Sequence, residues 1–209
     1  MALTKVRGKG LGTLGDGTAS DTAIVFDGNA QDFHIGLDDS TDSLTIGLGS
    51  ALGTTSHMVF DANGHITKPL QPAFLVQPAS GSMDNLAINT NHTIAYGTEI
   101  FDQNGDFSSN TFTAPVTGRY QLNVNLYISQ IDHDVTYYQP QVNTSNRTYY
   151  FIIGTSGFDA DVNYMTINFV VLADMDANDT ATVSFPTQNA GAAQVDLGTD
   201  SYFSGYLVC

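Results

Sequence analysis

Positive charge is scarce in this sequence. Its 209 residues include 6 Lys and Arg against 21 Asp and Glu, which gives a formal net charge of −15 at pH 7. Nucleic-acid-binding proteins neutralise phosphates with clustered basic side chains, so this balance excludes that class, and an anionic membrane surface would repel the chain for the same reason. No apolar run approaches the roughly 18 residues that a membrane-spanning helix needs. We therefore expect a soluble chain with no nucleic-acid partner and no membrane insertion.

Cysteine is nearly absent as well. Cys209, the last residue, is the single cysteine, and it cannot form a disulfide within the chain. Stability must then come from packing or from assembly. The basic residues near the start are not followed by the apolar stretch of a secretory signal peptide, so we expect a protein made in the cytoplasm without such a signal.

Residues typical of helix surfaces are missing too. Twenty of the 21 acidic residues are Asp, and Glu99 is the one Glu. Asp, Gly, Asn, Ser and Thr favour turns, and no segment carries an apolar stripe at helical spacing. The sequence therefore predicts an all-β protein.

Composition divides the chain into three parts. Residues 1–20 form a Gly-rich N-terminal arm that carries Lys5, Arg7 and Lys9 and has too few apolar residues for a core. Residues 21–68 contain short apolar runs closed by Asp, Gly and Asn, which indicates short strands. Pro69 and Pro72 form a stiff junction, and residues 69–209 carry the strongest strand patterns.

The middle part, residues 21–68, offers little apolar surface per strand. We expect a short β stalk in which three chains supply one another's missing core, since assembly can replace a private core. An ordinary β-meander packed on the next domain is the alternative.

Alternation is clearest between Arg119 and Ser129, where every second residue is apolar. Similar alternation follows at residues 165–171 and 181–185, and residues 149–153 have the composition of a buried strand. Several such strands separated by turns predict a jelly-roll β-sandwich.

Four segments carry a family resemblance. They are Phe101 to Phe107, the element Phe112-Thr-Ala-Pro115-Val-Thr-Gly118-Arg-Tyr120, Val171 to Val183, and Phe203-Ser-Gly205-Tyr-Leu207. In this order they resemble the complement-one-q globular head, whose jelly roll is shared with tumour necrosis factor. The resemblance implies a homotrimer for residues 69–209. The residues of the second and fourth segments act in the fold: Phe112 and Tyr120 as core anchors, Pro115 as a strand terminator, Gly118 as a turn residue, and Phe203 and Gly205 as a closing signature.

A second resemblance lies in the first 70 residues. The run Asp21 to Asp39, with Ile46 to Ser50 and Met58 to Gly64, resembles the N-terminal region of tail-fibre-like virion proteins of marine tailed bacteriophages. It implies a virion protein made in the host cytoplasm. Its arm would dock on other virion proteins through Lys5, Arg7 and Lys9, and its trimeric head would face outward.

These resemblances lead to one hypothesis of function and two alternatives. The hypothesis is a trimeric phage fibre or spike on the exposed virion surface whose head binds a host surface glycan or outer-membrane component. A capsid decoration or head-fibre protein that stabilises the shell is one alternative, and a secreted bacterial adhesin is the other. The loop from Ile131 to Asn146 does not match the pattern of the complement-one-q head. Receptor contacts are expected among the polar and aromatic residues of this loop and those just after it. These candidates are Asp132, His133, Asp134, Tyr137, Tyr138, Arg147 and Tyr149.

Catalytic and metal-binding motifs are weak. The acidic segment from Asp174 to Asp179 lacks the Gly and the Glu of a calcium loop, and the five histidines show no paired ligand spacing. No nucleophile elbow or phosphate-binding loop occurs, and the Gly10 to Gly15 repeat has neither a preceding strand nor a following helix. We expect no enzyme activity, no cofactor and no bound metal.

Overall fold

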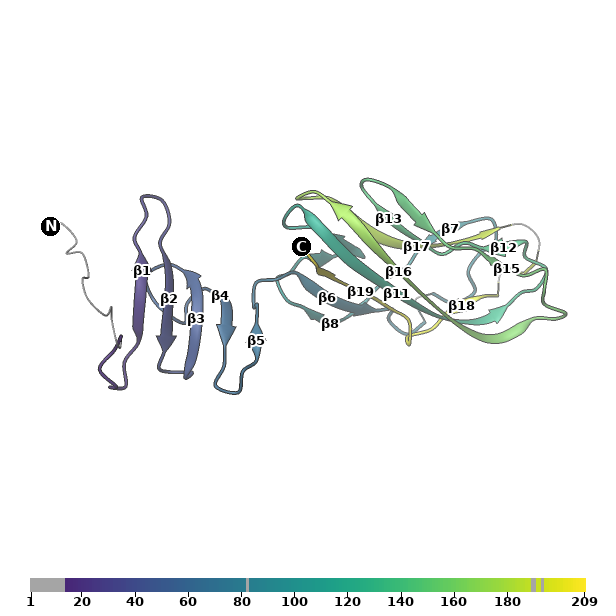
Figure 1. Cartoon of the computed structure of the whole chain (residues 1–209). Helices are drawn as coiled ribbons and strands as arrows, with labels where there is room; N and C mark the ends of the chain where they lie inside the picture. The colour runs from purple at the N-terminus through teal and green to yellow at the C-terminus, as the bar shows by residue number, and fades with distance from the viewer. Residues whose placement is uncertain (1–13, 82, 189–190, 193) are drawn as a thin grey trace. The chain divides into compact units, whose positions relative to one another are not determined.

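The computed structural model describes residues 14–81, 83–188, 191–192 and 194–209. The chain divides into two compact units, Met1–Leu70 and Gln71–Cys209. All regular secondary-structure elements in the described part of the chain are β-strands (Figure 1), which confirms the predicted all-β class. Within the same part of the chain, no helix is long and apolar enough to cross a membrane.

The first unit holds one antiparallel sheet in which each strand pairs with the next. Its turns use residues that tolerate a positive φ, such as Asp42 at 51° and Gly64 at 87°. The strands are short because these turn residues recur every few positions. They are β1 (Thr22–Phe26), β2 (Phe33–Asp38), β3 (Ser43–Leu48), β4 (Ser56–Phe60) and β5 (Ile66–Thr67).

The second unit is a sandwich of two large antiparallel sheets. One sheet has the strand order β16-β11-β19-β6-β8, with β18 beside β11. Its strands are β6 (Ala73–Gln77), β8 (Thr98–Asp102), β11 (Gly118–Ile131), β16 (Val162–Met175), β18 (Asp196–Leu197) and β19 (Tyr202–Leu207). The long pair β11 and β16, with 14 residues each, runs the length of this sheet.

The other sheet has the order β14-β13-β17-β10-β9, with three short strands added beside it. Its main strands are β9 (Phe107–Ser108), β10 (Thr111–Thr113), β13 (Gln141–Thr144), β14 (Thr148–Tyr150) and β17 (Thr180–Gln188). The short strands are β7 (Asn91–Thr93), β12 (Tyr137–Tyr138) and β15 (Ile153–Gly154). The two sheets together form the predicted jelly-roll β-sandwich.

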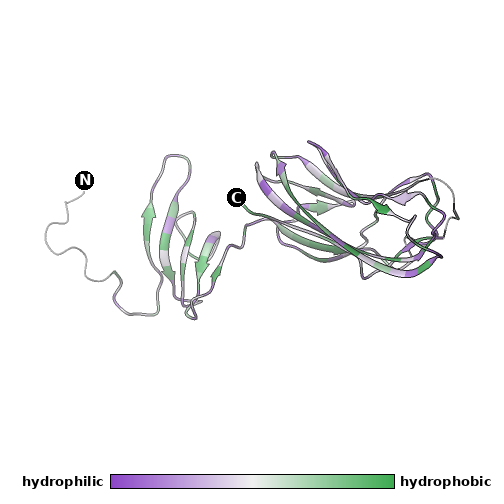
Figure 2. Cartoon of the chain, turned by 45° about the vertical axis from the view of Figure 1, so that its right-hand side comes forward, coloured by the Kyte–Doolittle hydropathy of each residue, from purple (hydrophilic) through white to green (hydrophobic). Residues whose placement is uncertain are grey.

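Aromatic and aliphatic side chains fill the space between these sheets, and hydrophobic segments alternate with polar ones along the strands (Figure 2). The alternation predicted for β11 is confirmed, since its apolar set points inward: Tyr120, Leu122, Val124, Leu126 and Ile128 are all at most 1% exposed. Phe112 is fully buried and stacks on Phe74, with the ring centroids 4.7 Å apart. The Tyr120 hydroxyl donates to the Val116 carbonyl at 2.7 Å, across the turn that holds Pro115.

Gly118 and Gly205 are required for close packing. A Cβ on Gly118 would lie 2.7 Å from the Cys209 carbonyl oxygen, and one on Gly205 would lie 2.8 Å from Cε1 of Phe74. Gly205 pairs with Leu122, and the fully buried Phe203 pairs with Val124. The proposed turn role of Gly118 is therefore corrected, because this residue begins β11 and makes room for the C-terminal backbone.

The prediction of a buried strand at residues 149–153 is wrong. The segment is divided between β14 and β15, and Tyr150 and Ile152 are each 61% exposed. β14 is an edge strand that pairs with β13 alone, so this segment is not enclosed by neighbouring strands.

Candidate functional site

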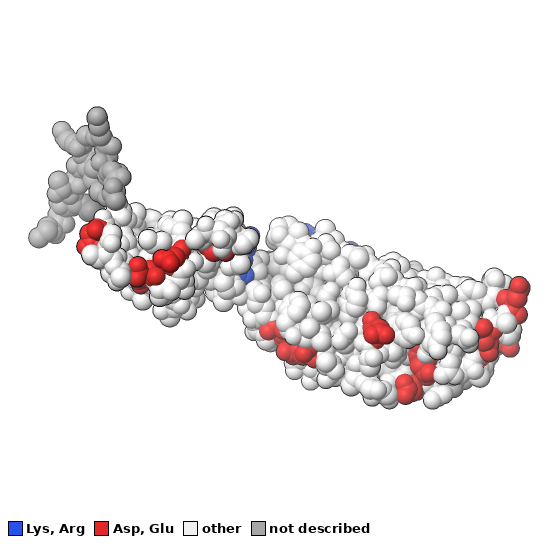
Figure 3. Space-filling view, turned by 90° about the horizontal axis from the view of Figure 1, so that it is seen from below, with Lys and Arg blue, Asp and Glu red and all other residues white. Residues whose placement is uncertain are grey.

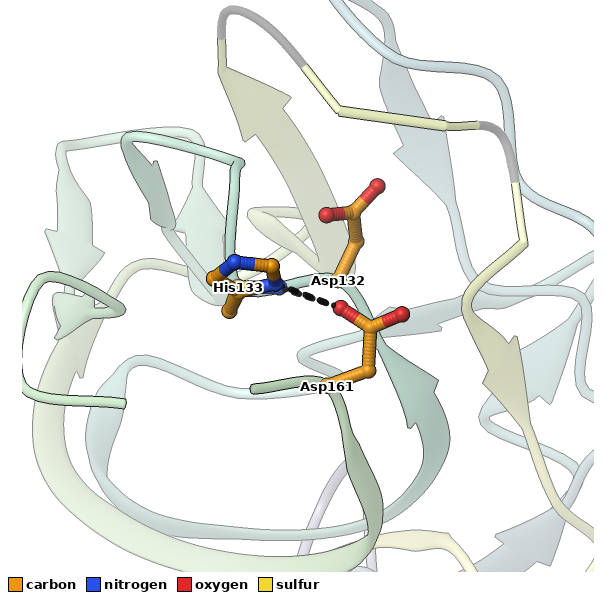
Figure 4. Close-up of side chains that lie close together, drawn as sticks. All are labelled: Asp132, His133 and Asp161. Carbon is orange, nitrogen blue, oxygen red and sulfur yellow. Dashed lines mark hydrogen bonds and ion pairs between the residues drawn. The ribbon is translucent and has the colours of Figure 1, made fainter. Parts of the chain in front are cut away.

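Two loops of the second unit are joined by a histidine and an aspartate. The first loop follows β11 and carries Asp132, His133 and Asp134, and the second precedes β16 and ends at Asp161. His133 Nδ1 lies 2.7 Å from Asp161 Oδ1, and the His133 amide donates to the same oxygen at 3.1 Å (Figure 4). We call this contact the His133–Asp161 clasp. Asp134 lies beside it, with Oδ1 3.3 Å from His133 Nε2.

Asp132 holds the loop that carries His133. It is 5% exposed, and its Oδ1 accepts from the Asp134 amide at 2.8 Å while its Oδ2 accepts from the Ala192 amide. The Asp132 amide donates to the Tyr138 hydroxyl at 3.1 Å. Tyr138 is 1% exposed and stacks on Phe185, so its ring cannot reach a receptor. The prediction that Asp132 and Tyr138 are receptor contacts is corrected on this point, since both hold the loop in place.

Tyr137 is half-buried, and its strand, β12, lies between β15 and β17. Of the five candidates from residues 132 to 138, His133, Asp134 and Tyr137 thus keep solvent-accessible surface.

The charges of the clasp shift its titration. The hydrogen bond to Asp161 raises the pKa of His133, and the charges of Asp134, Asp161 and Asp132 act in the same direction. The reciprocal bond from His133 lowers the pKa of Asp161 from 3.8 to about 2. Burial raises the pKa of Tyr138 to about 12, so its hydroxyl stays protonated. The clasp is therefore an ion pair in mildly acidic solution.

The remaining candidates, Arg147 and Tyr149, lie elsewhere. The Arg147 guanidinium donates to Asp174 Oδ2 at 2.6 Å, and the Tyr149 hydroxyl is 3.5 Å from Asp174 Oδ1. Asp161 and Asp174 flank nearly the whole of β16, so at about 3.3 Å per residue the two clusters are roughly 40 Å apart. The structure does not bring the seven predicted residues into one site.

The chain enters this unit at the Asp174 end. Ala73, near the start of this unit, pairs with Tyr206 of β19, and Tyr206 pairs with Gln121 of β11. Gln121 in turn pairs with Leu172 of β16, two residues from Asp174. The His133–Asp161 clasp is consequently at the far end, and we call residues 132–135, 155–161 and 194–196 the distal loops. Asp161 and Gln194, which donates to Asp161 Oδ2 at 3.3 Å, were missed by sequence reasoning because they are remote from His133 in the chain.

One group of metal-ligand type occurs in the described residues. Ligand atoms of Asp132, His133 and Asp161 all lie within 4.8 Å of one another. Each of the three side chains already makes a hydrogen bond within the protein, and in Figure 4 the Asp132 carboxylate points away from the other two side chains. These contacts account for the cluster without an ion.

Acidic side chains are spread over both units on the face shown in Figure 3, where few basic atoms are visible. The predicted docking residues Lys5, Arg7 and Lys9 fall outside the residues that the structure describes.

Comparison with solved structures supports the fold of the second unit. The globular domain of zebrafish complement 1qA matches with a TM-score of 0.51 and 16% identity, over 66% of this chain and 98% of that one. At this identity the match shows the jelly-roll fold and nothing finer. It agrees with the resemblance found in the segments around Phe112 and Phe203.

Two further solved structures are less similar. Murine APRIL matches at 0.47 with 14% identity, covering 66% of this chain and 99% of its own. A vertex protein of PRD1 matches at 0.44 with 12% identity, covering 66% and 97%. No protein-family model and no curated protein matches the sequence.

Proposed function

We propose that this chain is a bacteriophage virion protein, a homotrimeric fibre or spike with a binding role in place of a catalytic one. Its jelly-roll head binds a glycan or an outer-membrane component of the host surface. The N-terminal arm attaches it to other virion proteins, and the trimer is exposed on the particle.

Two uncharged, partly apolar cross-strand rows in the head are the observation that carries the proposed assembly. Leu172, Gln121 and Tyr206 form one cross-strand row on the outer side of the six-stranded sheet, and Val170, Asn123, Ser204, Leu75 and Phe101 form the next. Val170, Leu172 and Phe101 are 55%, 59% and 49% exposed. Exposed apolar side chains that gather in neighbouring rows favour burial against another subunit.

The distal loops are the proposed host contact. They lie at the end of the head remote from Gln71, and they carry the exposed groups Asp134, Asp159 and Asp161 together with His133. Acidic and imidazole groups on a shallow surface form hydrogen bonds with sugar hydroxyls, and three copies add avidity. Weak single sites thereby give firm adsorption.

Light scattering and an adsorption assay test this proposal together. The expected mass of the 209-residue protein in solution is three times 22.3 kDa. The purified trimer is expected to bind host cells and to block phage adsorption. His133→Ala in the distal loops should weaken the block, and so should Tyr137→Ala, since Tyr137 pairs with Gly154 beside those loops. Arg147→Ala, at the other end of the head, is the matched control and should leave it unchanged.

Different outcomes overturn different parts of the proposal. A folded monomer would overturn the trimeric assembly. Virions that lack the protein, adsorb normally and rupture at a lower temperature would overturn host binding and assign the protein to capsid stabilisation.

A further inference from the structure

The first unit buries its polar face and exposes its apolar one. Every buried apolar side chain among the described residues lies at Phe74 or later. Between residues 14 and 70, the buried side chains are His34, Asp38, Ser43 and Thr45. This unit therefore has no apolar core within its own described residues, the reverse of what a stable monomeric sheet requires.

The loop between β3 and β4 covers the polar face. His34 Nδ1 contacts the Gly49 carbonyl at 3.0 Å, and the Leu48 amide donates to the Thr55 carbonyl at 2.9 Å. A Cβ on Gly53 would lie 2.9 Å from Asp38 Oδ2, which places this loop over that carboxylate. The chain thus protects one side of the sheet and leaves the other open.

The open side consists of three apolar rows that run across the strands. The register places on this side Phe26, Phe33 and Leu48 in one row, Ile24, Ile35, Ile46 and Met58 in the next, and Thr22, Leu37, Leu44, Phe60 and Ile66 in the third. None of these paired positions is charged. We call these residues the open face.

The size of the open face matches an interface. Seven of its side chains are 39% to 57% exposed, and together they leave roughly 600 Å² of apolar surface in water, the upper limit for one patch on an ordinary monomer. The four half-buried members, Ile46, Leu48, Met58 and Phe60, add to this. A standard interface buries about 800 Å² on each partner.

We propose that the open face is covered by the same face of two further copies of this chain. The inference rests on the proposed trimer, from which the number three is taken. Because the face has no charge, it offers no electrostatic complement to a different partner, whereas closed symmetry covers all identical faces at once. The three sheets form the walls of a prism, and β2 and β3, the middle strands of the open face, lie nearest the threefold axis.

Thiol reactivity in the full-length protein tests this arrangement. In a Cys209→Ser background, Ile35→Cys places a thiol on the open face and Val25→Cys places one on the opposite face. The control is closely matched, since Ile35 and Val25 are 39% and 40% exposed in the single chain. We expect maleimide to label Ile35→Cys at least about tenfold more slowly than Val25→Cys.

Mass measurement on the same samples separates the possible failures. If the protein is a trimer and maleimide labels both thiols at equal rates, the open face is not covered, although the head still forms a trimer. If the protein is a monomer and both thiols are labelled rapidly, both the covered face and the proposed trimer are wrong. A monomer that protects Ile35→Cys shows that a segment of the same chain occupies the face.

A charged substitution gives a second, independent readout. Ile35→Asp should raise the protein concentration at which half the trimer dissociates by at least about tenfold, because it buries a carboxylate near the axis. Val25→Asp should leave that concentration unchanged. Equal effects of the two variants, or none, would contradict the inference.

Discussion

At the residue scale, the fold changes the titration of His133 and Asp161 together. The pKa of His133 is raised and that of Asp161 is lowered to about 2, because each stabilises the charged form of the other. Because the pKa of His133 is raised, its protonated form stabilises the fold fully below pH 6.5, the ordinary histidine pKa. This stabilisation is lost as the pH rises through the shifted pKa. Because the pKa of Asp161 is lowered, its carboxylate stabilises the fold fully above pH 3.8, and this stabilisation is lost as the pH falls toward 2. The ion pair is therefore complete between about pH 4 and 6.5 and weakens above that window.

The first prediction concerns this titration. NMR titration of His133 should give a pKa above 6.5 in the native protein and a lower one in Asp161→Asn, which removes the carboxylate. Asp61→Asn is the control, since Asp61 pairs with His65 in the other unit. An unchanged His133 titration in Asp161→Asn would mean that the clasp does not form in solution.

A second residue-scale prediction tests the core anchor Phe112. Its ring is fully buried against Phe74 and Tyr120. Phe112→Ala should lower the free energy of unfolding of the head by about 3–5 kcal/mol, through lost burial and the cavity left behind. Urea denaturation measures this, with the 61% exposed Tyr150 replaced by Ala as the control. Equal losses in the two variants would remove Phe112 from its role as anchor.

At the element scale, the close approach of β19 to β11 and β6 gives a third prediction. The missing Cβ of Gly205 would lie 2.7 Å from Leu122 Cδ2. Gly205→Ala should therefore destabilise the head by about 1–3 kcal/mol, because the side chains of Leu122 and Phe74 must shift within a well-packed core. At Gly157 an added Cβ meets nothing within 4 Å, so Gly157→Ala should change stability by no more than about 0.5 kcal/mol. Equal effects at both positions would show that the contacts around Gly205 do not determine the stability of the head.

Prediction from sequence succeeded where side-chain alternation reports burial directly. The inward set of β11 follows from the spacing of Tyr120, Leu122 and Val124, because successive side chains in a strand point to opposite faces. In β2 the same alternation is present, but its apolar residues Phe33 and Ile35 are the exposed set. Alternation separates two faces without saying which one the single chain covers. That choice depends on the loop over the polar face.

The candidate site was harder to predict because the sequence does not show which end of the long strand β16 each predicted residue contacts. Arg147 and His133 are 14 positions apart in the sequence, yet each pairs with an aspartate beside a different end of β16. Neither Asp161 nor Asp174 has a local motif that identifies its partner. Tyr138 has the composition of a surface aromatic, but its side chain is buried because it stacks on Phe185 in the core.

At the scale of the whole molecule, the proposed trimer must be stable against its own charge. A net charge of −15 per chain becomes three times −15, or −45, in the trimer. The open face is uncharged, and so are the Leu172 and Val170 rows of the six-stranded sheet. Association therefore relies on apolar burial while the surrounding Asp residues repel. Acid-rich surfaces and apolar interfaces therefore act in opposite directions on one equilibrium.

The fourth prediction follows from that opposition. Raising monovalent salt from about 0.01 M to 0.15 M shortens the screening length from about 30 Å to 8 Å, so repulsion falls and the concentration for half-dissociation should fall with it. Analytical ultracentrifugation at fixed pH measures the change. Sucrose, which favours compact states without screening charge, is the control for a general solvent effect. Dissociation that increases with salt would mean that attractive ion pairs join the chains and that the uncharged faces are not the interface.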